Sequence, residues 1–356
     1  MIEKRYFDIL KNLISIDTSN INNNNRFCNY IYNYCKQFDV DIKLLKSNYC
    51  NAKSIIVEPK YINETVDFVF SGHSDVVSVK GQNWDYNPFK LNIINGFAYG
   101  RGVVDMKGFL ACILYKLKDF LDKKLKFLFV ITYDEETNVN SIKEICDYLK
   151  KYKINKLAII GEPSSCNIKN LHKGDFDIKV EIFGKSFHSS EPSKGVNAIE
   201  IGARIINFIE KCKKKLKDKT VTTSIGVING GTAVNIVPDY CKFCFDIRFY
   251  NLNIACNLLK QIQYFCKKLI LQKKCKIKIE KICEILSLNN SIDNKNAEFM
   301  GCTEAGFYQQ LGVPSVIFGL GDFAEAHREN EKLEIKQINH YLKKLDGLIN
   351  KYLVQE

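Results

Sequence analysis

The residues best suited to chemistry in this sequence begin with His73 and Asp75. They follow the apolar run Phe68 to Ser71, which predicts a buried strand, and open α/β sheets carry their chemistry on loops that leave the carboxyl ends of such strands. Two positions apart in an extended segment, the two side chains point to the same side, so His73 can bind a metal while Asp75 accepts the second ring N–H. A histidine in this position is more often structural than a ligand, so the metal interpretation depends on further ligands.

Asp105 is a second candidate. The surrounding segment, Gly100 to Gly108, is punctuated by glycines, which permit tight turns and a close approach of the backbone to a ligand. Asp105 would lie in a loop immediately before a helix predicted over residues 109–120. A metal ligand and a simple helix cap are equally good interpretations of this carboxylate.

Further carboxylates follow two more apolar runs. Residues 125–132 form an almost uninterrupted apolar stretch, which predicts a central, parallel strand buried on both faces, and Asp134, Glu135 and Glu136 come directly after it. Adjacent carboxylates repel one another unless a cation or solvent relieves them, so a solvated loop is the alternative. Residues 157–160 predict another such strand, which is followed by Glu162.

A histidine completes this set near the end of the chain. His327 follows an apolar strand predicted over residues 315–318 and the segment Gly319-Leu320-Gly321. With His327, the chain offers two imidazoles and three carboxylates, which exceed the needs of one tetrahedral zinc and suit two metals sharing a carboxylate, about 3.5–4 Å apart. Such a pair lowers the pKa of a shared water towards about 7. Glu135 is beside a ligand but free itself, so it suits the role of general base.

Composition limits the class of protein. The chain has 356 residues, 46% of them hydrophobic, and no stretch approaches the ~20 apolar residues that span a bilayer. The first residues lack the basic and apolar regions of a signal peptide, so a cytoplasmic location is expected. The 14 cysteines are scattered through apolar segments and are expected to be reduced; Cys241 and Cys244 would face opposite sides of a strand, which disfavours a metal knuckle.

The formal net charge of +12 raises the question of an anionic partner. The lysine excess runs through the whole chain, and its densest clusters, residues 211–219 and 267–281, lack interleaved aromatic residues. Solvated faces are therefore the better interpretation, and neither a nucleic acid nor a membrane is expected as a partner.

The order of predicted elements indicates two domains with different patterns of secondary structure. Helices at 2–14, 26–38 and 109–120 alternate with buried strands at 54–57, 68–71, 125–132 and 157–160, which is typical of an α/β domain with a mostly parallel central sheet. From residue 176 the order is strand 176–183, helix 197–216, strands 221–228 and 240–249, helix 254–269 and strand 275–282, typical of an α+β, ferredoxin-like unit. Helices predicted at 303–311 and 335–353 then resume the α/β pattern of the first domain. The expected division is a first domain of residues 1–174 and 287–356, with residues 175–286 inserted.

Several motifs, taken together and in order, resemble those of the aminoacylase and carboxypeptidase family of di-zinc peptidases and deacylases, the M20 family, over nearly the whole chain. They are Gly72-His73-Ser74-Asp75, Gly100-Arg101-Gly102 with Asp105-Met106-Lys107-Gly108, Asp134-Glu135-Glu136, Gly161-Glu162-Pro163, His188-Ser189-Ser190 with Gly195-Val196-Asn197-Ala198, and Ala326-His327 with Glu331.

The resemblance implies a zinc-peptidase-like catalytic domain holding two Zn²⁺, for which Co²⁺ is a possible substitute. One ion would be bound by His73 and Glu162 and the other by Glu136 and His327, with Asp105 bridging. Asp75 would orient His73, and Glu135 would be the general base that later protonates the leaving amine.

The resemblance also implies a homodimer formed through the inserted domain, which serves as a dimerisation and lid domain. Its His188 would reach the partner's active site to stabilise the tetrahedral oxyanion. Without the family context, a structural role for His188 is the better interpretation.

Within the family, the sequence is most similar to the acetylornithine deacetylase branch, through motifs at residues 84–89, 172–174, 230–238 and 302–306. The resemblance implies that Arg248 grips the α-carboxylate of the substrate, with Asn235 nearby as a donor. Thr303 belongs to the same substrate-binding set, and Glu304 is a candidate partner for a cationic side chain or, equally, an exposed glutamate at a helix start. One departure is Gly319-Leu320-Gly321, where the family usually has proline between the glycines.

The expected reaction is metal-dependent hydrolysis of the acyl amide of a small N-acyl amino acid. The first expectation is N-acetylornithine, giving ornithine and acetate for arginine biosynthesis. The alternative is the same chemistry on succinyl-diaminopimelate, on another N-acyl amino acid or on a dipeptide.

Overall fold

The computed structural model describes residues 4–273, 276–285, 287–289 and 297–354. These divide into two compact units, of which the first is Met1–Leu171 with Leu288–Glu356 and the second is His172–Ser287. The domain limits expected from sequence fall after residues 174 and 286. Three positions used in those predictions, Ile2, Cys275 and residue 286, lie outside the described residues.

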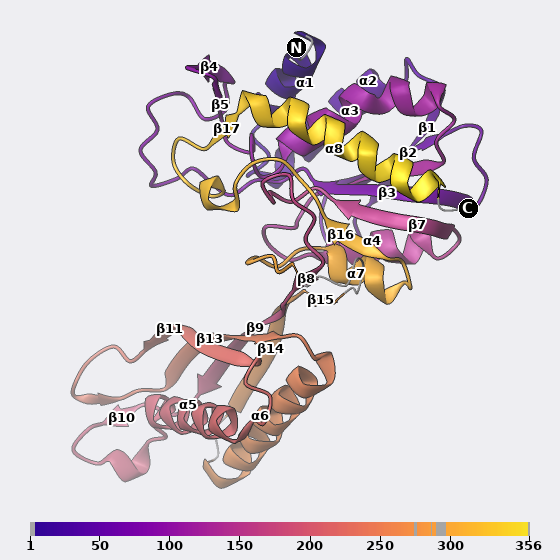
Figure 1. Ribbon diagram of the computed structural model, residues 1–356. Helices are drawn as coiled ribbons and strands as arrows, with labels where there is room; N and C mark the ends of the chain where they lie inside the picture. The colour runs from indigo at the N-terminus through magenta and orange to yellow at the C-terminus, as the bar shows by residue number, and fades with distance from the viewer. Residues whose placement is uncertain (1–3, 274–275, 286, 290–296, 355–356) are drawn as a thin grey trace. The chain divides into compact units, whose positions relative to one another are not determined.

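The first unit is built on a six-stranded sheet in the order β1-β2-β6-β3-β7-β16 (Figure 1). Its strands are β1 (Val40–Lys46), β2 (Lys53–Pro59), β3 (Thr65–His73), β6 (Phe127–Thr132), β7 (Lys153–Ile160) and β16 (Ser315–Ile317). β3 pairs in parallel with both β6 and β7, and β16 pairs in parallel with β7, whereas β2 and β1 continue the sheet antiparallel. All six residues of β6 are buried, as its apolar run predicted.

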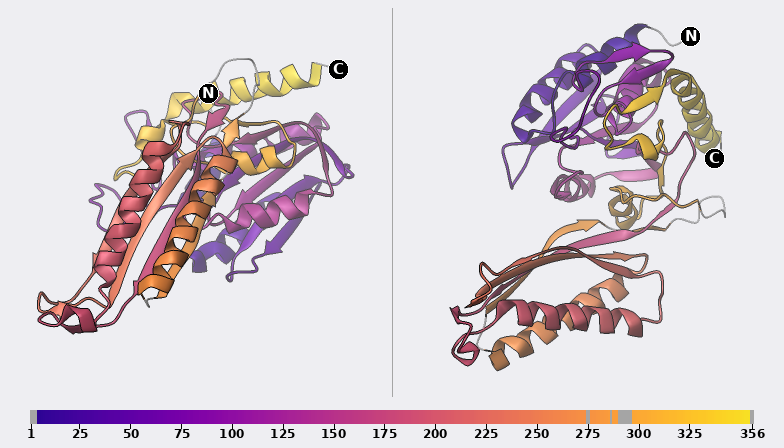
Figure 2. Two further views of the ribbon diagram at one scale, coloured as in Figure 1. Left: turned by 90° about the horizontal axis from the view of Figure 1, so that it is seen from below. Right: turned by 90° about the vertical axis from the view of Figure 1, so that its left-hand side faces the viewer.

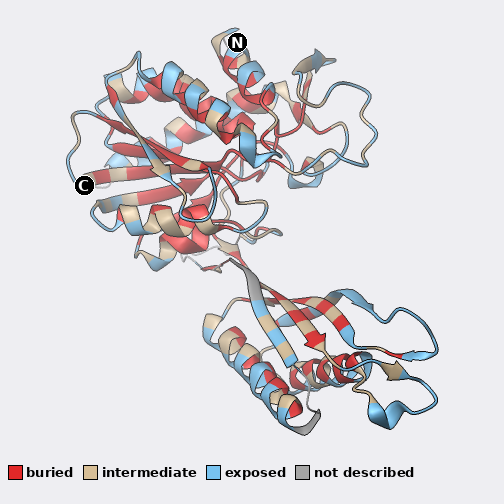
Figure 3. Ribbon diagram, turned by 180° about the vertical axis from the view of Figure 1, so that it is seen from behind, coloured by how far each residue is buried: buried red, intermediate tan, exposed pale blue. Residues whose placement is uncertain are grey.

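Helices cover both faces of this sheet. They are α1 (Lys4–Ile14), α2 (Asn24–Cys35), α3 (Lys107–Asp122), α4 (Asn140–Leu149), α7 (Ala305–Gln310) and α8 (Ile335–Val354). The apolar sides of α1, α2, α3 and α8 share one core with alternate residues of the strands, among them Phe68, Phe70 and Phe129. α4 and α7 lie against the other face, and the strands β2, β3 and β6 between the layers are almost entirely buried (Figure 3).

Short elements complete the first unit. A three-stranded sheet has the order β17-β5-β4, and a two-stranded sheet has the order β15-β8. Their strands are β4 (Asn92–Ile94), β5 (Phe97–Tyr99), β8 (Leu171–His172), β15 (Leu288–Asn289) and β17 (Lys332–Glu334), and the single turns of 3₁₀ helix are η1 (Ile21–Asn23) and η4 (Phe323–Glu325).

The second unit is a four-stranded antiparallel sheet in the order β11-β13-β9-β14 with two helices on one face (Figure 2). The elements are β9 (Gly174–Phe183), α5 (Ala198–Lys215), β11 (Thr222–Gly230), β13 (Tyr240–Phe249), α6 (Leu252–Lys273) and β14 (Lys276–Ile285). A small hairpin of β10 (Phe187–His188) and β12 (Ile236–Val237) and the turn η2 (Pro192–Lys194) lie at one end. The predicted strand–helix–strand–strand–helix–strand order is therefore the observed one.

The second unit has its own apolar core. Alternate residues of β9 and β13, including Ile178, Val180 and Phe243, face α5 and α6, whereas their neighbours along each strand face away from the helices. Cys241 is buried on the helix side and Cys244 is not, so this pair faces opposite sides as expected. The cysteines among the described residues are free.

Candidate metal centre

Five ligand-type side chains converge at the carboxyl ends of the parallel strands. β3 ends at His73, β6 leads into the loop that carries Glu136, and β7 leads to Glu162. Because β6 and β7 both flank β3 and run parallel to it, these three segments leave the sheet along one edge, at the point where the strand order reverses. Asp105 joins them from the turn that precedes α3, and His327 joins them from the loop after η4.

The ligand atoms form three overlapping groups, of which two share the Asp105 carboxylate and the third joins His73 with Glu135 and Glu136. The first contains His73, Asp105 and Glu162, and the second contains Asp105, Glu136 and His327; within each group the ligand atoms lie within 4.8 Å of one another. Asp105 uses a different oxygen for each histidine: Oδ1 lies 3.0 Å from His73 Nε2, and Oδ2 lies 3.2 Å from His327 Nε2. This is the arrangement expected of a carboxylate that bridges two cations.

The orientation of His73 suits a metal ligand. Its Nδ1 lies 2.9 Å from the backbone oxygen of Asp75, so the ring N–H is donated there and the lone pair of Nε2 is free. Nε2 faces oxygens of three carboxylates, at 3.0 Å from Asp105, 3.7 Å from Glu162 and 4.0 Å from Glu135. A single nitrogen cannot satisfy three carboxylates with one proton, so a cation among them fits these residues.

The electrostatics of the cluster support the same conclusion. Burial raises the pKa values of Glu135, Glu136 and Glu162, and repulsion from neighbouring carboxylates raises them further. Burial also opposes the ionisation of Asp105, but hydrogen bonds from His327 and His73 outweigh it and lower the Asp105 pKa. The cluster thus gathers more negative charge than its two histidines can balance, and divalent cations would relieve this repulsion.

Asp75 contacts both His73 and a second loop. The ring N–H of His73 goes to the backbone oxygen of Asp75, and the nearer carboxylate oxygen lies within ion-pair distance of Nδ1, at 3.5 Å. The carboxylate also accepts the backbone N–H groups of Glu135, at 3.3 Å, and Glu136, at 2.9 Å. Asp75 therefore links the β3 loop to the β6 loop, and its orienting effect on His73 runs mainly through its backbone.

Glu135 and Glu136 occupy distinct positions in the same loop. Glu136 contacts His327 Nε2 at 3.0 Å. The Glu135 carboxylate makes no hydrogen bond with any described residue, although one of its oxygens lies 4.0 Å from His73 Nε2. A buried carboxylate beside the ligands, with a raised pKa and no partner of its own, has the properties of a general base.

Glu304 and Thr303 lie at the start of α7. Glu304 is 2% exposed, so the interpretation as an exposed helix-start glutamate is wrong; burial raises its pKa to about 8, and the charge of His73 opposes this rise. Its Oε1 is buried without a hydrogen-bond partner. Thr303 is fully buried and its hydroxyl oxygen accepts the N–H of Ala305, so in this structure it stabilises the turn that begins α7.

The remaining predicted site residues lie in the second unit, at opposite ends of β13. His188 pairs with Ile236 in the β10–β12 hairpin, and the backbone oxygen of Asn235 accepts the N–H of Ser189, so His188 and Asn235 are close together. Arg248 lies eight positions along β13 from Tyr240, which is roughly 26 Å at the rise of a strand. The expectation that Asn235 lies near Arg248 therefore does not hold within one chain.

Arg248 is engaged by acidic neighbours on the sheet. Its Nη2 lies 3.1 Å from Asp175 and its Nε lies 3.2 Å from Asp246. Burial raises the Asp175 pKa to about 7, and the positive charge of Arg248 opposes this rise. A substrate carboxylate would have to compete with these two groups for the guanidinium.

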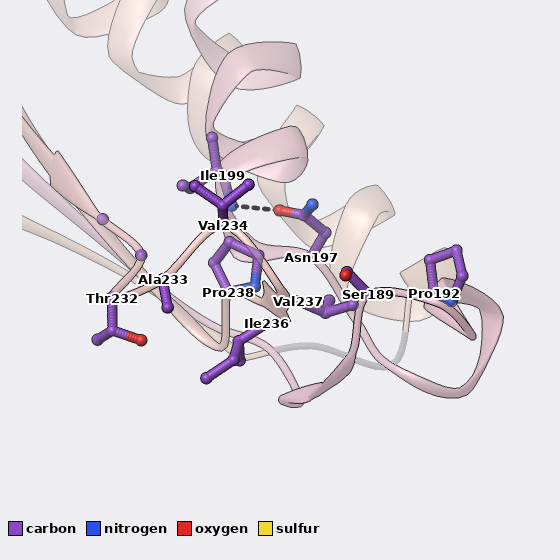
Figure 4. A pocket seen from close by; sticks show the side chains of 12 residues that line it. Ser189, Pro192, Asn197, Ile199, Thr232, Ala233, Val234, Ile236, Val237 and Pro238 are labelled. Carbon is purple, nitrogen blue, oxygen red and sulfur yellow. Dashed lines mark hydrogen bonds between the residues drawn. The ribbon is translucent and has the colours of Figure 1, made fainter.

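A shallow hollow of about 560 Å³ lies beside the β10–β12 hairpin (Figure 4). Asn197, whose side chain accepts the N–H of Ile199 at the start of α5, forms one side of it. Most of the other side chains around it are apolar, including Ile199, Val234 and Ile236, and all three are exposed.

The sequence profile of peptidase family M20/M25/M40 matches residues 69–351. The chain belongs to this family. It is 30% identical to the acetylornithine deacetylase of Buchnera aphidicola subsp. Acyrthosiphon pisum (strain Tuc7), covering 98% of each chain. It is also 30% identical to the acetylornithine deacetylase of Pasteurella multocida, covering 80% of each, and 29% identical to an uncharacterized metallohydrolase of Methanocaldococcus jannaschii, covering 98% of each.

Solved structures of the M20 fold are similar over almost the whole chain. A tripeptidase from Staphylococcus aureus has a TM-score of 0.74 at 21% identity, with 97% of each chain covered. An M20 family metallo-carboxypeptidase from Sulfolobus solfataricus has a TM-score of 0.75 at 18% identity, covering 96% of this chain and 97% of the other. The predicted fold class and family are thereby confirmed.

Membership of the M20 family makes this protein a metal-dependent hydrolase. The two ligand groups around Asp105 are where its residues could hold divalent metal. No helix within the described part of the chain has both the length and the apolar character needed to cross a membrane.

Sequence reasoning missed some residues that hold the site together. Thr18 is buried and donates its hydroxyl hydrogen to the backbone oxygen of Ser74 beside His73. Gln82 donates to the backbone oxygen of His327. Neither residue carries a charge or sits in a periodic pattern, so the sequence offered no signal for these contacts.

Proposed function

We propose that this M20 enzyme removes the acetyl group from N-acetylornithine, giving ornithine and acetate. The observation that carries the proposal is the pair of ligand groups that share Asp105, with Glu135 beside them and without a hydrogen-bond partner for its carboxylate among the described residues. The relatives that are 30% identical and named acetylornithine deacetylase support the choice of substrate. Synthesis of arginine is the process in which this product would be used.

Two Zn²⁺, or Co²⁺ in their place, fit the two ligand groups, one with His73 and Glu162 and the other with Glu136 and His327. When bound, such ions supply the positive charge that makes water acidic enough to attack at neutral pH and that stabilises a developing oxyanion. The protein's own contribution to proton transfer is Glu135. Its carboxylate accepts a proton from the attacking water and returns it to the nitrogen as the acyl carbon–nitrogen bond breaks, so that water adds across the amide.

The substrate would be held by groups on both units. Arg248 is the proposed partner of the α-carboxylate, since its planar guanidinium can exchange an acidic neighbour for a ligand carboxylate. Glu304, with an unpaired buried oxygen, is the proposed partner of a cationic side chain, and Thr303 holds the turn that positions it. Asn235 would donate a hydrogen bond to the oxyanion or the carboxylate.

We also propose that the protein is a homodimer and that His188 serves the partner's site. Arg248 lies near one end of β13, whereas His188 and Asn235 lie in and beside the β10–β12 hairpin, which precedes the other end at Tyr240. Tyr240 and Arg248 are roughly 26 Å apart along the strand, and groups at its two ends would not contact one small substrate, which supports this proposal. A second copy supplies the missing pair to each site.

The exposed edge of the second unit supports a protein partner. β11 is the outermost strand of its sheet, and Val227 and Ile228 are 47% and 57% exposed on it. The whole stretch Thr220 to Pro238 contains no charged residue, although 26% of the chain is charged. Edge strands are usually protected from pairing by charged side chains, so an uncharged one favours pairing with another strand.

The substrate is tested by comparing kcat/KM on a panel with the metal-loaded protein. The panel contains N-acetylornithine, N-acetylcitrulline, N-acetyl-lysine, succinyl-diaminopimelate and a dipeptide. We expect N-acetylornithine to have the highest value and a chelator to abolish all turnover. If the kcat/KM of a different compound is higher by tenfold or more, the protein is instead a desuccinylase, another N-acyl amino acid deacylase or a dipeptidase.

A regulatory or nucleic-acid-binding protein with an inactive site is a different class of function. The presence of all five ligands and of Glu135 disfavours it, as do lysine clusters without interleaved aromatics. Tight binding of DNA or RNA without hydrolysis of any panel compound would favour this class instead. A cytoplasmic location stays a prediction from the sequence.

A further inference from the structure

His327 is the least supported of the five ligands by regular structure. It lies in a loop with its backbone in the left-handed region, at φ 62°, and its side chain is 50% exposed. A ligand in such a loop needs other groups to fix it if it is to hold a cation with useful geometry. Among the described residues, the one hydrogen bond to the His327 backbone comes from Gln82, whose Nε2 donates to the backbone oxygen at 2.8 Å.

The side-chain amide of Gln82 has a fixed orientation. Its Oε1 accepts two donors, Arg101 Nη2 at 2.6 Å and Trp84 Nε1 at 3.1 Å. Turning the amide over would bring its N–H₂ against both donors and its oxygen against the oxygen of His327, so only one orientation satisfies all the groups. Gln82 is thus held on one side by Arg101 and Trp84 and holds His327 on the other.

Arg101 is a buried group with contacts on several segments. It is 1% exposed, lies 5.1 Å from the centre of the Trp84 ring and pairs with Glu331 Oε2 at 2.7 Å. It also donates to the backbone oxygen of Arg328, the residue after His327, at 3.2 Å. The loop of His327 is therefore attached to Arg101 both directly and through Gln82.

Glu331 connects the same network to the bridging ligand. It is fully buried, and its two oxygens accept the backbone N–H groups of Gly102, Val104 and Asp105 at 2.9, 2.7 and 3.1 Å. A carboxylate that accepts several backbone N–H groups fixes the course of that segment. The backbone of Asp105 is thereby fixed by the same buried ion pair that supports His327.

We propose that a clamp anchored on the buried Arg101–Glu331 ion pair positions Asp105 and His327, and through them the cation that they share with Glu136. Its members are Gln82, Arg101 and Glu331, which bond to the backbone of a ligand or of a neighbouring residue, and Trp84, which donates to the side chain of Gln82. They are positioning residues, since they act through Asp105 and His327. The inference rests on the proposed two-cation site. It predicts that Gln82 controls the affinity of one of the two cations and leaves the other unchanged.

The test uses Gln82→Glu, because glutamate can still accept from Arg101 and Trp84 but cannot donate to the oxygen of His327. The control is Asn83→Glu, which places the same charge on the exposed neighbour, whose side chain makes no hydrogen bond with any described residue. Purified protein, stripped with a chelator, is titrated with Co²⁺ by calorimetry and by absorption. Wild type and Asn83→Glu should each bind two ions, and the affinity for each ion should be the same in the two proteins. Gln82→Glu should bind one ion with its wild-type affinity and the second about 10–100-fold more weakly.

Two results with Gln82→Glu would overturn the clamp. One is an unchanged affinity for both ions. The other is equal weakening of both with a lowered Tm, which would indicate general destabilisation. If wild type itself binds no pair of ions, the proposed two-cation site fails first, and the clamp fails with it.

Discussion

The two adjacent glutamates after β6 differ in what their carboxylates contact. Glu136 is engaged by His327, whereas Glu135 lies near His73 without a hydrogen-bond partner among the described residues. This difference separates the ligand from the proposed base.

For the base, we expect Glu135→Gln to lower kcat by about 10²–10⁴-fold, since glutamine keeps the shape of the side chain but cannot accept the proton. KM should change little, and the bound metal should stay near that of the wild type. Steady-state kinetics and elemental analysis of the same preparation measure both. Turnover at the wild-type rate would remove Glu135 from this role.

The candidate ligands were predictable because each follows a recognisable local pattern. His73, Glu136 and Glu162 come just after buried strands, and parallel strands place such residues along one edge. Gln82 was not predictable, because its role depends on the folding of three distant segments onto one another. The carboxylate of Asp75 was assigned to His73 on spacing, but two backbone N–H groups from another loop lie closer to it.

At the scale of elements, close backbone packing supports the ligand that follows β7. A Cβ added to Gly319 would overlap the backbone oxygens of Gly161 and Glu162. The glycine at this position in Gly319-Leu320-Gly321 therefore allows the β16 loop to lie directly against the Glu162 segment. The absence of the family's usual proline does not prevent this approach.

Gly319→Ala should destabilise the protein by about 1–3 kcal/mol, because the overlap is with backbone that cannot rotate away. It should also weaken metal binding by displacing Glu162. Gly347→Ala is the matched control: it lies within α8 with no atom near the added Cβ, so it should stabilise by about 0.5–1 kcal/mol. Urea unfolding of both variants measures the free energies, and equal effects would contradict the packing argument.

A second element-scale prediction concerns His172 in β8. Burial lowers its pKa from 6.5 to about 4, opposed by a hydrogen bond to the backbone oxygen of Lys173. The folded protein therefore binds fewer protons than the unfolded chain between these pH values. The contribution of His172 to the free energy of unfolding should fall by at most about 3 kcal/mol as pH drops from 6.5 to 4.

The variant His172→Asn removes the titrating group, so its stability should fall less steeply over that range. His340→Asn, at an exposed position of α8, is the control and should keep the wild-type slope. Circular dichroism in urea at several pH values supplies the free energies. Identical slopes for wild type and His172→Asn would show that another group governs the acid response.

Most long elements were predictable, and those missed have physical reasons. β1 carries charged residues at Asp41 and Lys43 because it is an edge strand, so its apolar pattern is weak. α4 begins after Val139, which has a left-handed backbone and no side-chain cap, so the sequence carries no signal for the start of this helix. Ile142, Ile145 and Leu149 within it do have helical spacing. The short strands β4, β5 and β17 form only through pairing with one another.

At the scale of the whole molecule, the main prediction is association through β11. Ile228→Lys places a charge on the exposed, uncharged edge strand and should convert the proposed dimer into monomers. Ile93→Lys is the control, because Ile93 is also an exposed isoleucine on an edge strand, β4 of the first unit. Sedimentation velocity over a range of concentrations measures the association.

If both variants remain dimers, β11 is not the interface. If Ile228→Lys is monomeric, its hydrolysis should also fall, because His188 could no longer serve a partner. Activity that survives in the monomer would contradict the proposed role of His188 in trans.

The uncharged stretch Thr220 to Pro238 gives association an unusual response to ionic strength. Each chain carries a formal charge of +12, so two copies repel one another wherever their lysines approach. Added salt shortens the range of this repulsion, to about 10 Å at 0.1 M, but leaves apolar contacts between neutral strands intact. Self-association of this protein should therefore become tighter as salt is added. Binding of its lysines to a polyanion would instead become weaker.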